Sequence, residues 1–123
     1  MHAWMKTKTA LKYILLLEPS IPRAIDFYQQ GLGATLRVAT TSWAELHVGD
    51  TTIALKQDSV VESTTTTNRT PMLVFDVDNV QDRLTRLLEM GARMDGGVQY
   101  TLDGSRLAVV QSPTGYLVGI IGQ

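Results

Sequence analysis

The fold is decided by residues 12–33, whose sequence is KYILLLEPSIPRAIDFYQQGLG. The apolar run that precedes the first proline is short, which favours a β-strand over a helix. Ser20 then offers an N-cap, and apolar side chains recur at helical spacing over residues 21–28. Gly31 and Gly33 are expected to end this helix. This stretch therefore predicts one strand followed directly by one amphipathic helix.

Strand-like stretches complete the first half of the chain. Residues 43–48 alternate in polarity, and a Gly-Asp turn leads into a second stretch at residues 51–55. Residues 58–70, which include four consecutive threonines, have little helical periodicity. We predict that they form a linker.

The second half repeats this pattern of elements. A β-like run at residues 72–77 precedes an apolar helical stripe at residues 80–88. Asp78-Asn79 offers an N-cap, with Asp78 expected to cap this helix or the turn before it, and Gly91 is expected to end the helix. Strands are predicted at residues 106–111 and 116–121. One helix cannot cover both faces of a small sheet, so the two β-α-β-β-β halves are expected to pair. We predict a single α+β domain over residues 1–123. Its parts are module one at about 10–57, the linker at 58–70 and module two at about 71–122.

Composition excludes several classes of function. The 123 residues include 11 basic and 12 acidic side chains, and the basic ones are scattered, which argues against a nucleic-acid partner. The chain has no cysteine, so disulfides, thiolate nucleophiles and Cys-ligated metals are excluded. No apolar run is long enough for a signal peptide or a membrane span. We expect a cytoplasmic protein without a membrane partner.

Several short motifs occur in a fixed order along the chain: AIDFY at 24–28, GLG at 31–33, WAEL at 43–46, FDVDN at 75–79 and SPTGY at 112–116. Their order and spacing resemble the glyoxalase/bleomycin resistance/dioxygenase domains of the vicinal oxygen chelate superfamily. The resemblance covers about residues 10–122. It implies two βαβββ modules that form a cupped mixed sheet with the helices on its convex face. It also implies a homodimer.

Metal-dependent members of that superfamily hold an ion with four His, Glu or Gln side chains from the first and last strand of each module. The resemblance places these positions at Tyr13, Ala54, Met72 and Gly119. Alanine and glycine have no donor atom, and a thioether or a neutral phenol is a poor ligand for a hard divalent ion. A register slip does not restore the site, because residues 12–17, 51–55 and 116–121 contain no histidine or acid. We expect no metal and no other cofactor.

Aromatic, apolar and a few polar side chains are the usual lining of a small-molecule site. If the aliphatic residues at positions 44, 46 and 48 pack under the helix, Trp43, Glu45 and His47 face the cavity. Arg106 could hold an anionic ligand at the rim. The candidate ligand-binding residues are Tyr13, Trp43, Glu45, His47, Met72 and Arg106. The alternatives are that the Glu–His pair belongs to an exposed polar face, that Met72 fills core, and that Arg106 is a solvated surface residue.

Three functions are compatible with this sequence. The first is a non-catalytic binding protein for a small molecule such as an antibiotic or a metabolite, with Trp43 as the best candidate for a stacking residue. The second is a lyase, isomerase or dioxygenase of the same superfamily that needs no metal or uses displaced ligands such as Glu45 and His47. The third is a regulatory or structural dimer that has no small ligand.

Overall fold

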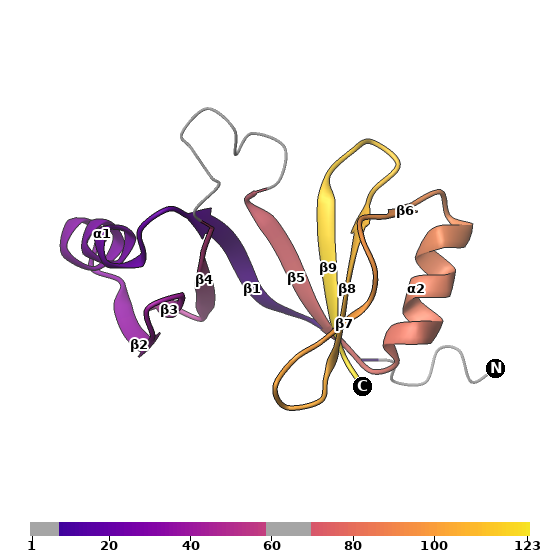
Figure 1. Ribbon diagram of the computed structural model, residues 1–123, viewed down its shortest axis with the longest axis horizontal. Helices are drawn as coiled ribbons and strands as arrows, with labels where there is room; N and C mark the ends of the chain where they lie inside the picture. Colours follow the sequence, from indigo (N-terminus) through magenta and orange to yellow (C-terminus); the bar gives the residue numbers. More distant parts are fainter. Residues whose placement is uncertain (1–7, 59–69) are drawn as a thin grey trace. The chain divides into compact units, whose positions relative to one another are not determined.

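The computed structural model describes residues 8–58 and 70–123. The predicted linker lies outside the described residues, except for its ends at positions 58 and 70. In the first half of the chain the elements are β1 (Thr9–Glu18), α1 (Ile21–Asp26), the π-helical turn η2 (Phe27–Gly31), β2 (Thr35–Ala39), β3 (Trp43–Val48) and β4 (Thr51–Gln57). In the second half they are β5 (Met72–Val77), α2 (Val80–Glu89), β6 (Arg93–Met94), β7 (Gln99–Tyr100), β8 (Arg106–Gln111) and β9 (Leu117–Gly122). Strands in mixed orientation with one helical segment in each half confirm the predicted α+β class (Figure 1).

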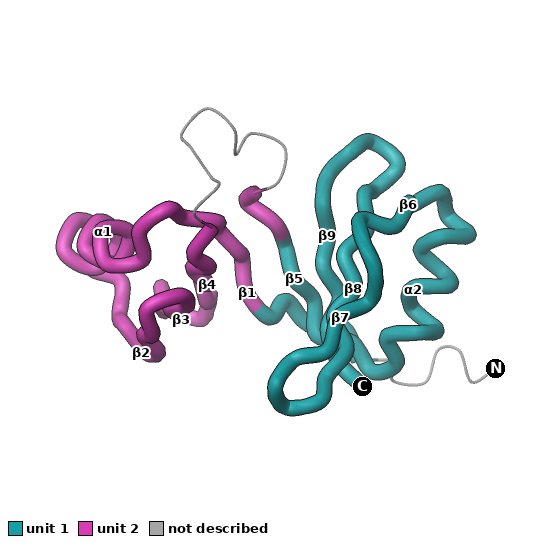
Figure 2. Tube along the Cα trace, viewed as in Figure 1, with its two compact units in different colours: residues 1–12, 73–123 teal, residues 13–72 magenta. Residues whose placement is uncertain are grey.

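The chain divides into two compact units (Figure 2). Unit 1 comprises residues 1–12 and 73–123, and unit 2 comprises residues 13–72. In unit 2 the strand order is β2-β3-β4-β1, with β1 and β4 parallel and the other pairs antiparallel. In unit 1 the order is β5-β9-β8-β6, where β5 and β9 are the parallel pair and β7 also pairs with β8. The two halves thus use the same kind of pairing, as their repeated pattern predicts.

The core of unit 2 lies between α1 and one face of its sheet. Ile21 and Ala24 on the helix pack with Ala44 and Leu46 of β3 and with Leu55 of β4. Both β3 residues are fully buried. Because side chains alternate along a strand, burial of these two residues turns their neighbours at positions 43, 45 and 47 to the opposite face.

The core of unit 1 is built in the same way on α2. Val80 and Leu84 of the helix pack with Ala108 and Val110 of β8 and with Ile120 of β9. Figure 1 shows α2 running alongside these strands. The positions of β9 that do not face α2, including Gly119, lie on the other face of the sheet.

Helix starts follow the sequence closely, with one correction. The backbone N–H of Arg23 donates to the Ser20 hydroxyl at 3.4 Å, so the predicted cap of α1 is confirmed. At α2 the cap is Asn79, whose side chain accepts from the N–H of Asp82 at 3.0 Å. Asp78, which was expected to cap this helix or the turn before it, instead accepts from the backbone N–H of Lys8 at 2.6 Å. A long-range partner thus takes the Asp78 side chain and leaves the cap to its neighbour.

Candidate ligand-binding site

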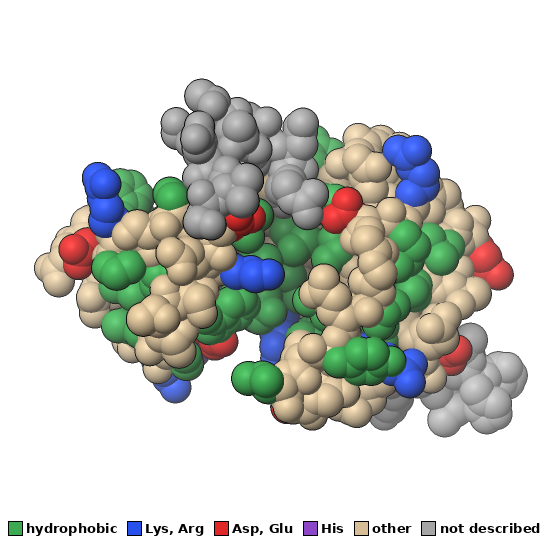
Figure 3. All heavy atoms as spheres, viewed as in Figure 1, with side chains coloured by type: hydrophobic (Ala, Val, Ile, Leu, Met, Phe, Trp, Pro, Cys, Tyr) green, Lys and Arg blue, Asp and Glu red, His purple; other side chains and the backbone are tan. Residues whose placement is uncertain are grey.

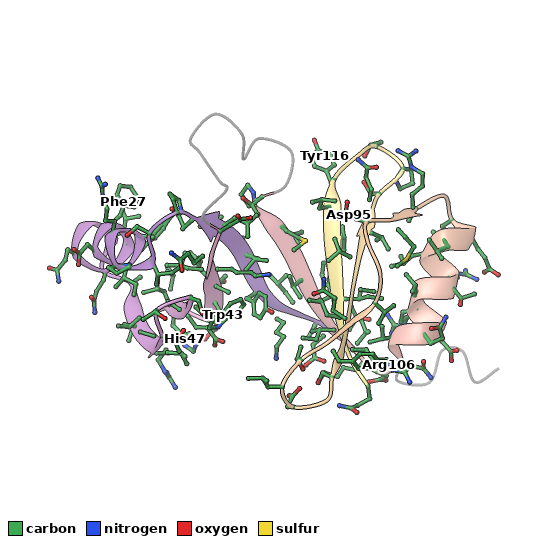
Figure 4. All side chains as sticks on the ribbon, in the orientation of Figure 1. Phe27, Trp43, His47, Asp95, Arg106 and Tyr116 are labelled. Atoms are coloured by element: carbon green, nitrogen blue, oxygen red, sulfur yellow. The ribbon has the colours of Figure 1, made fainter. Side chains whose placement is uncertain are left out.

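Trp43, Glu45 and His47 lie on the face of the unit 2 sheet that points away from α1. In the antiparallel pairing of β3 with β4, Trp43 stands opposite Lys56, Glu45 opposite Ala54 and His47 opposite Thr52. All three side chains therefore lie on the expected face of β3, opposite the buried Ala44 and Leu46, and each is partly exposed. That they line a ligand cavity stays a prediction. Figure 4 shows Trp43 and His47 on this strand.

An ordered aromatic cluster forms at one end of this face. The rings of Tyr13 and Trp43 meet edge to face, with centroids 5.6 Å apart and planes at 71°. The indole Nε1–H of Trp43 donates to Glu45 Oε2 at 2.9 Å. Edge-to-face aromatic pairs and hydrogen bonds to carboxylates are both stabilising, so the indole is held from two sides. We call Tyr13, Trp43 and Glu45 the aromatic cluster.

The charge state of the aromatic cluster follows from its burial. Burial raises the pKa of the Tyr13 phenol, and the nearby Glu45 carboxylate raises that pKa further. Both effects disfavour the phenolate. Tyr13 is therefore a neutral hydroxyl at physiological pH, suited to hydrogen bonding and packing rather than to binding a cation as a phenolate.

The four positions where the superfamily resemblance places metal ligands do not fit a metal in this chain. Ala54 lies beside Leu15 and Glu45 in the sheet register and has no donor atom. A side chain at Gly119 would place its Cβ 3.2 Å from Val74 Cγ2, closer than ordinary contact. Tyr13 and Met72 are buried, one as a neutral phenol and the other as a thioether. No group of three or more His, Asp or Glu side chains suited to a metal occurs among the residues that the structure describes.

Arg106 belongs to the other unit. It begins β8, is exposed, and stands opposite Tyr100 on β7 and Gly122 on β9 (Figure 4). The predicted site residues therefore fall into two groups. Five of them, Tyr13, Trp43, Glu45, His47 and Met72, belong to unit 2, and Arg106 belongs to unit 1.

Two hollows in the described surface lie elsewhere and were not predicted from sequence. One, of about 440 Å³, is in unit 2 and is lined by Glu18, Pro19, Ser20, Arg23, Ala24, Phe27 and Tyr28. The other, of about 380 Å³, is in unit 1 and is lined mainly by Lys8, Lys12, Asp76, Asp78, Asp103, Ser105 and Gln123. For the first hollow the sequence holds one signal, since Phe27 does not fall on the apolar stripe of the helix. The structure leaves its side chain 63% exposed.

On the face shown in Figure 3, basic and acidic side chains are dispersed rather than gathered in a stripe. Within the described ranges 8–58 and 70–123, no helix has the length and apolar character needed to cross a membrane.

Comparison with known proteins decides the family. The model of the glyoxalase/bleomycin resistance protein/dioxygenase superfamily matches residues 10–120, which is nearly the whole chain. The chain belongs to this superfamily. No match is found among curated proteins.

Solved structures of the superfamily fold resemble the chain over most of its length. A hypothetical protein from Bacillus halodurans is 19% identical, with 94% of this chain and 95% of that chain covered and a TM-score of 0.70. Methylmalonyl-CoA epimerase from Mycobacterium tuberculosis is also 19% identical, with 91% and 86% covered and a TM-score of 0.68. A superfamily member from Vibrio splendidus is 14% identical, with 96% and 100% covered and a TM-score of 0.62. At such identities these similarities concern the fold and leave the activity open.

Proposed function

We propose that this superfamily member is a non-catalytic binding protein that holds a planar, partly apolar small molecule, such as an antibiotic or a metabolite, without a metal. The aromatic cluster carries the proposal. It includes Tyr13, one of the four positions at which the superfamily resemblance places a metal ligand, and it would offer aromatic surface in place of metal chemistry.

The aromatic cluster is suited to binding because it is already ordered. Trp43 is partly exposed, whereas Tyr13 is 9% exposed, so an incoming molecule would meet mainly the indole. The bond to Glu45 fixes the indole before a ligand arrives. Binding then costs little side-chain entropy, which is the advantage of a preorganised site.

The experiment is a screen of planar aromatic compounds, followed by titration of the indole N–H signal of Trp43 by NMR. The chain has two tryptophans, and Trp4→Phe assigns the two indole signals. Trp43→Ala should weaken the best compound at least about tenfold, because aromatic stacking adds to the buried area. Val48→Ala is the matched control, since Val48 is on the same strand, is 51% exposed and points to the other face. Equal binding by wild type and Trp43→Ala would refute the proposal.

An enzyme with displaced ligands makes a different prediction. If Glu45 and His47 held a metal, tag-free protein incubated with Zn, Ni, Mn or Fe(II) and then desalted would retain close to one ion per chain. We expect near-zero metal. We also expect His47→Ala to leave the affinity for the screened compound nearly unchanged. Glu45→Ala should keep most of the affinity and lose only the part that depends on holding the indole in place, whereas in a catalyst either variant would lose turnover.

We further propose that the protein is a homodimer. Unit 1 exposes three large apolar side chains close together in the chain, Val98, Tyr100 and Leu102, of which Tyr100 is 69% exposed. Solvent-exposed apolar surface of this kind is often covered by a partner. Light scattering at micromolar concentration should give twice the chain mass, and a monomeric mass would refute this proposal.

A further inference from the structure

The 440 Å³ hollow of unit 2 is a second place where the chain could bind a small molecule. It lies where the end of β1 leads into α1 and η2, and its lining comes from residues 18–28. Figure 4 shows Phe27 on this helical segment, whereas Trp43 and His47 belong to β3. None of the residues of the aromatic cluster lines it, so the hollow is separate from the site proposed above. Its volume falls within the usual range for small-molecule sites.

The hollow is lined by two side chains of opposite charge, Glu18 and Arg23, which form no salt bridge with each other. The carboxylate of Glu18 is partly buried, and burial raises its pKa. Arg23, one turn into α1, is exposed. The one salt bridge found among the described residues joins Lys8 to Asp76, so Glu18 and Arg23 do not pair with each other. A partly buried carboxylate without a partner favours binding of a cation, and a guanidinium favours binding of a carboxylate.

An aromatic wall completes the hollow. Phe27 and Tyr28 meet edge to face, with ring centroids 5.1 Å apart and planes at 88°. Phe27 is 63% exposed, so its ring is open to contact with a bound molecule. Burial and the neighbouring Glu18 raise the pKa of the Tyr28 phenol, so Tyr28 is neutral and close to the carboxylate. The π-helical turn that carries both rings is a rare element, often found at functional sites.

We infer that this hollow binds an α-amino acid with an apolar side chain. The ammonium group would pair with Glu18, the carboxylate with Arg23, and the apolar side chain would lie against Phe27 and Tyr28. Complementarity to both charges is what selects a zwitterion, since a simple amine or a simple acid satisfies only one of them.

The test is titration of uniformly labelled protein with L-phenylalanine, L-leucine and L-methionine, following backbone amide signals. At least one of the three amino acids, added at up to about 10 mM, should shift backbone amide signals that cluster in residues 18–28. This concentration range covers weak specific binding. N-acetyl-L-phenylalanine lacks the ammonium charge and phenethylamine lacks the carboxylate. Both should bind at least about tenfold more weakly than L-phenylalanine or not at all.

Charge-neutralising variants identify the residues involved. Glu18→Gln and Arg23→Gln should each weaken binding at least about tenfold, whereas Glu89→Gln and Arg86→Gln, exposed charges on α2, should not. Glutamine is isosteric with glutamate and retains the first three side-chain carbons of arginine, and an unchanged thermal midpoint shows that the variants fold. Trp43→Ala should leave this binding unchanged, so failure here is distinguishable from failure of the proposed function. The inference is overturned if none of the three amino acids shifts residues 18–28. It is also overturned if the two truncated analogues bind as tightly as L-phenylalanine.

Discussion

The hydrogen bond between Trp43 and Glu45 can be measured as a coupling energy. Trp43→Phe removes the donor, Glu45→Ala removes the acceptor, and the double variant completes a thermodynamic cycle. The bond is 2.9 Å long and its acceptor carries a charge, which would give about 1.5–3 kcal/mol at a buried site. Because both side chains are partly exposed, solvent screening lowers the expected coupling to about 1 kcal/mol.

The assay is urea unfolding of the wild type, the two single variants and the double variant, monitored by circular dichroism. A second cycle with Glu45→Gln separates charge from geometry, since the amide oxygen still accepts from the indole. The coupling in the second cycle should be about half of that in the first. A first-cycle coupling below about 0.3 kcal/mol would mean that the indole is not held by Glu45. The preorganisation on which the proposed function rests would then be wrong.

Three further outcomes follow from the same structure. Gly122→Ala should destabilise the fold by about 3 kcal/mol in the same urea assay, because the new Cβ would lie 2.1 Å from the backbone oxygen of Val77. Gly97→Ala is the control: its Cβ meets nothing within 4 Å, so the free energy of unfolding should change by less than about 0.5 kcal/mol. The free energy of unfolding should decline as pH rises above about 10.0. The pKa of Tyr13 is higher in the folded state than in the unfolded chain, so the unfolded chain loses this proton first and is favoured at high pH. Tyr13→Phe should lessen the decline when unfolding is measured as a function of pH. The Asp103 carboxyl should titrate with a pKa of about 2 by NMR, because the Thr101 hydroxyl donates to the carboxylate and stabilises it. Thr101→Val should raise this pKa toward its ordinary value. An unchanged pKa in the variant would refute the role given to Thr101.

The secondary structure, and the face of the sheet on which each side chain lies, were predictable because both follow from the periodicity of apolar residues. The alternation in residues 43–48 is sufficient to place Trp43 and Glu45 on one face and Leu46 in the core, and the structure has them so. The predicted strand at 72–77 and the stop of the second helix at Gly91, whose φ is 102°, are also confirmed.

What the sequence did not predict depends on contacts between distant segments. Capping of α2 by Asn79 rather than Asp78 required knowing that Lys8, 70 residues away, occupies the aspartate. The π-helical turn that follows Asp26 has no periodic signal of its own, so the helix was expected to continue regularly. The hollow beside Glu18 depends on how the end of β1 turns into α1, which composition and spacing do not specify.

The most direct test of the central claim is the dissociation constant of the best planar aromatic compound, measured for wild type and Trp43→Ala in buffer containing a strong metal chelator. The proposed function predicts that the chelator leaves wild-type affinity unchanged and that Trp43→Ala binds at least about tenfold more weakly. It is contradicted if the chelator abolishes binding, if the two proteins bind equally, or if no planar compound binds at all.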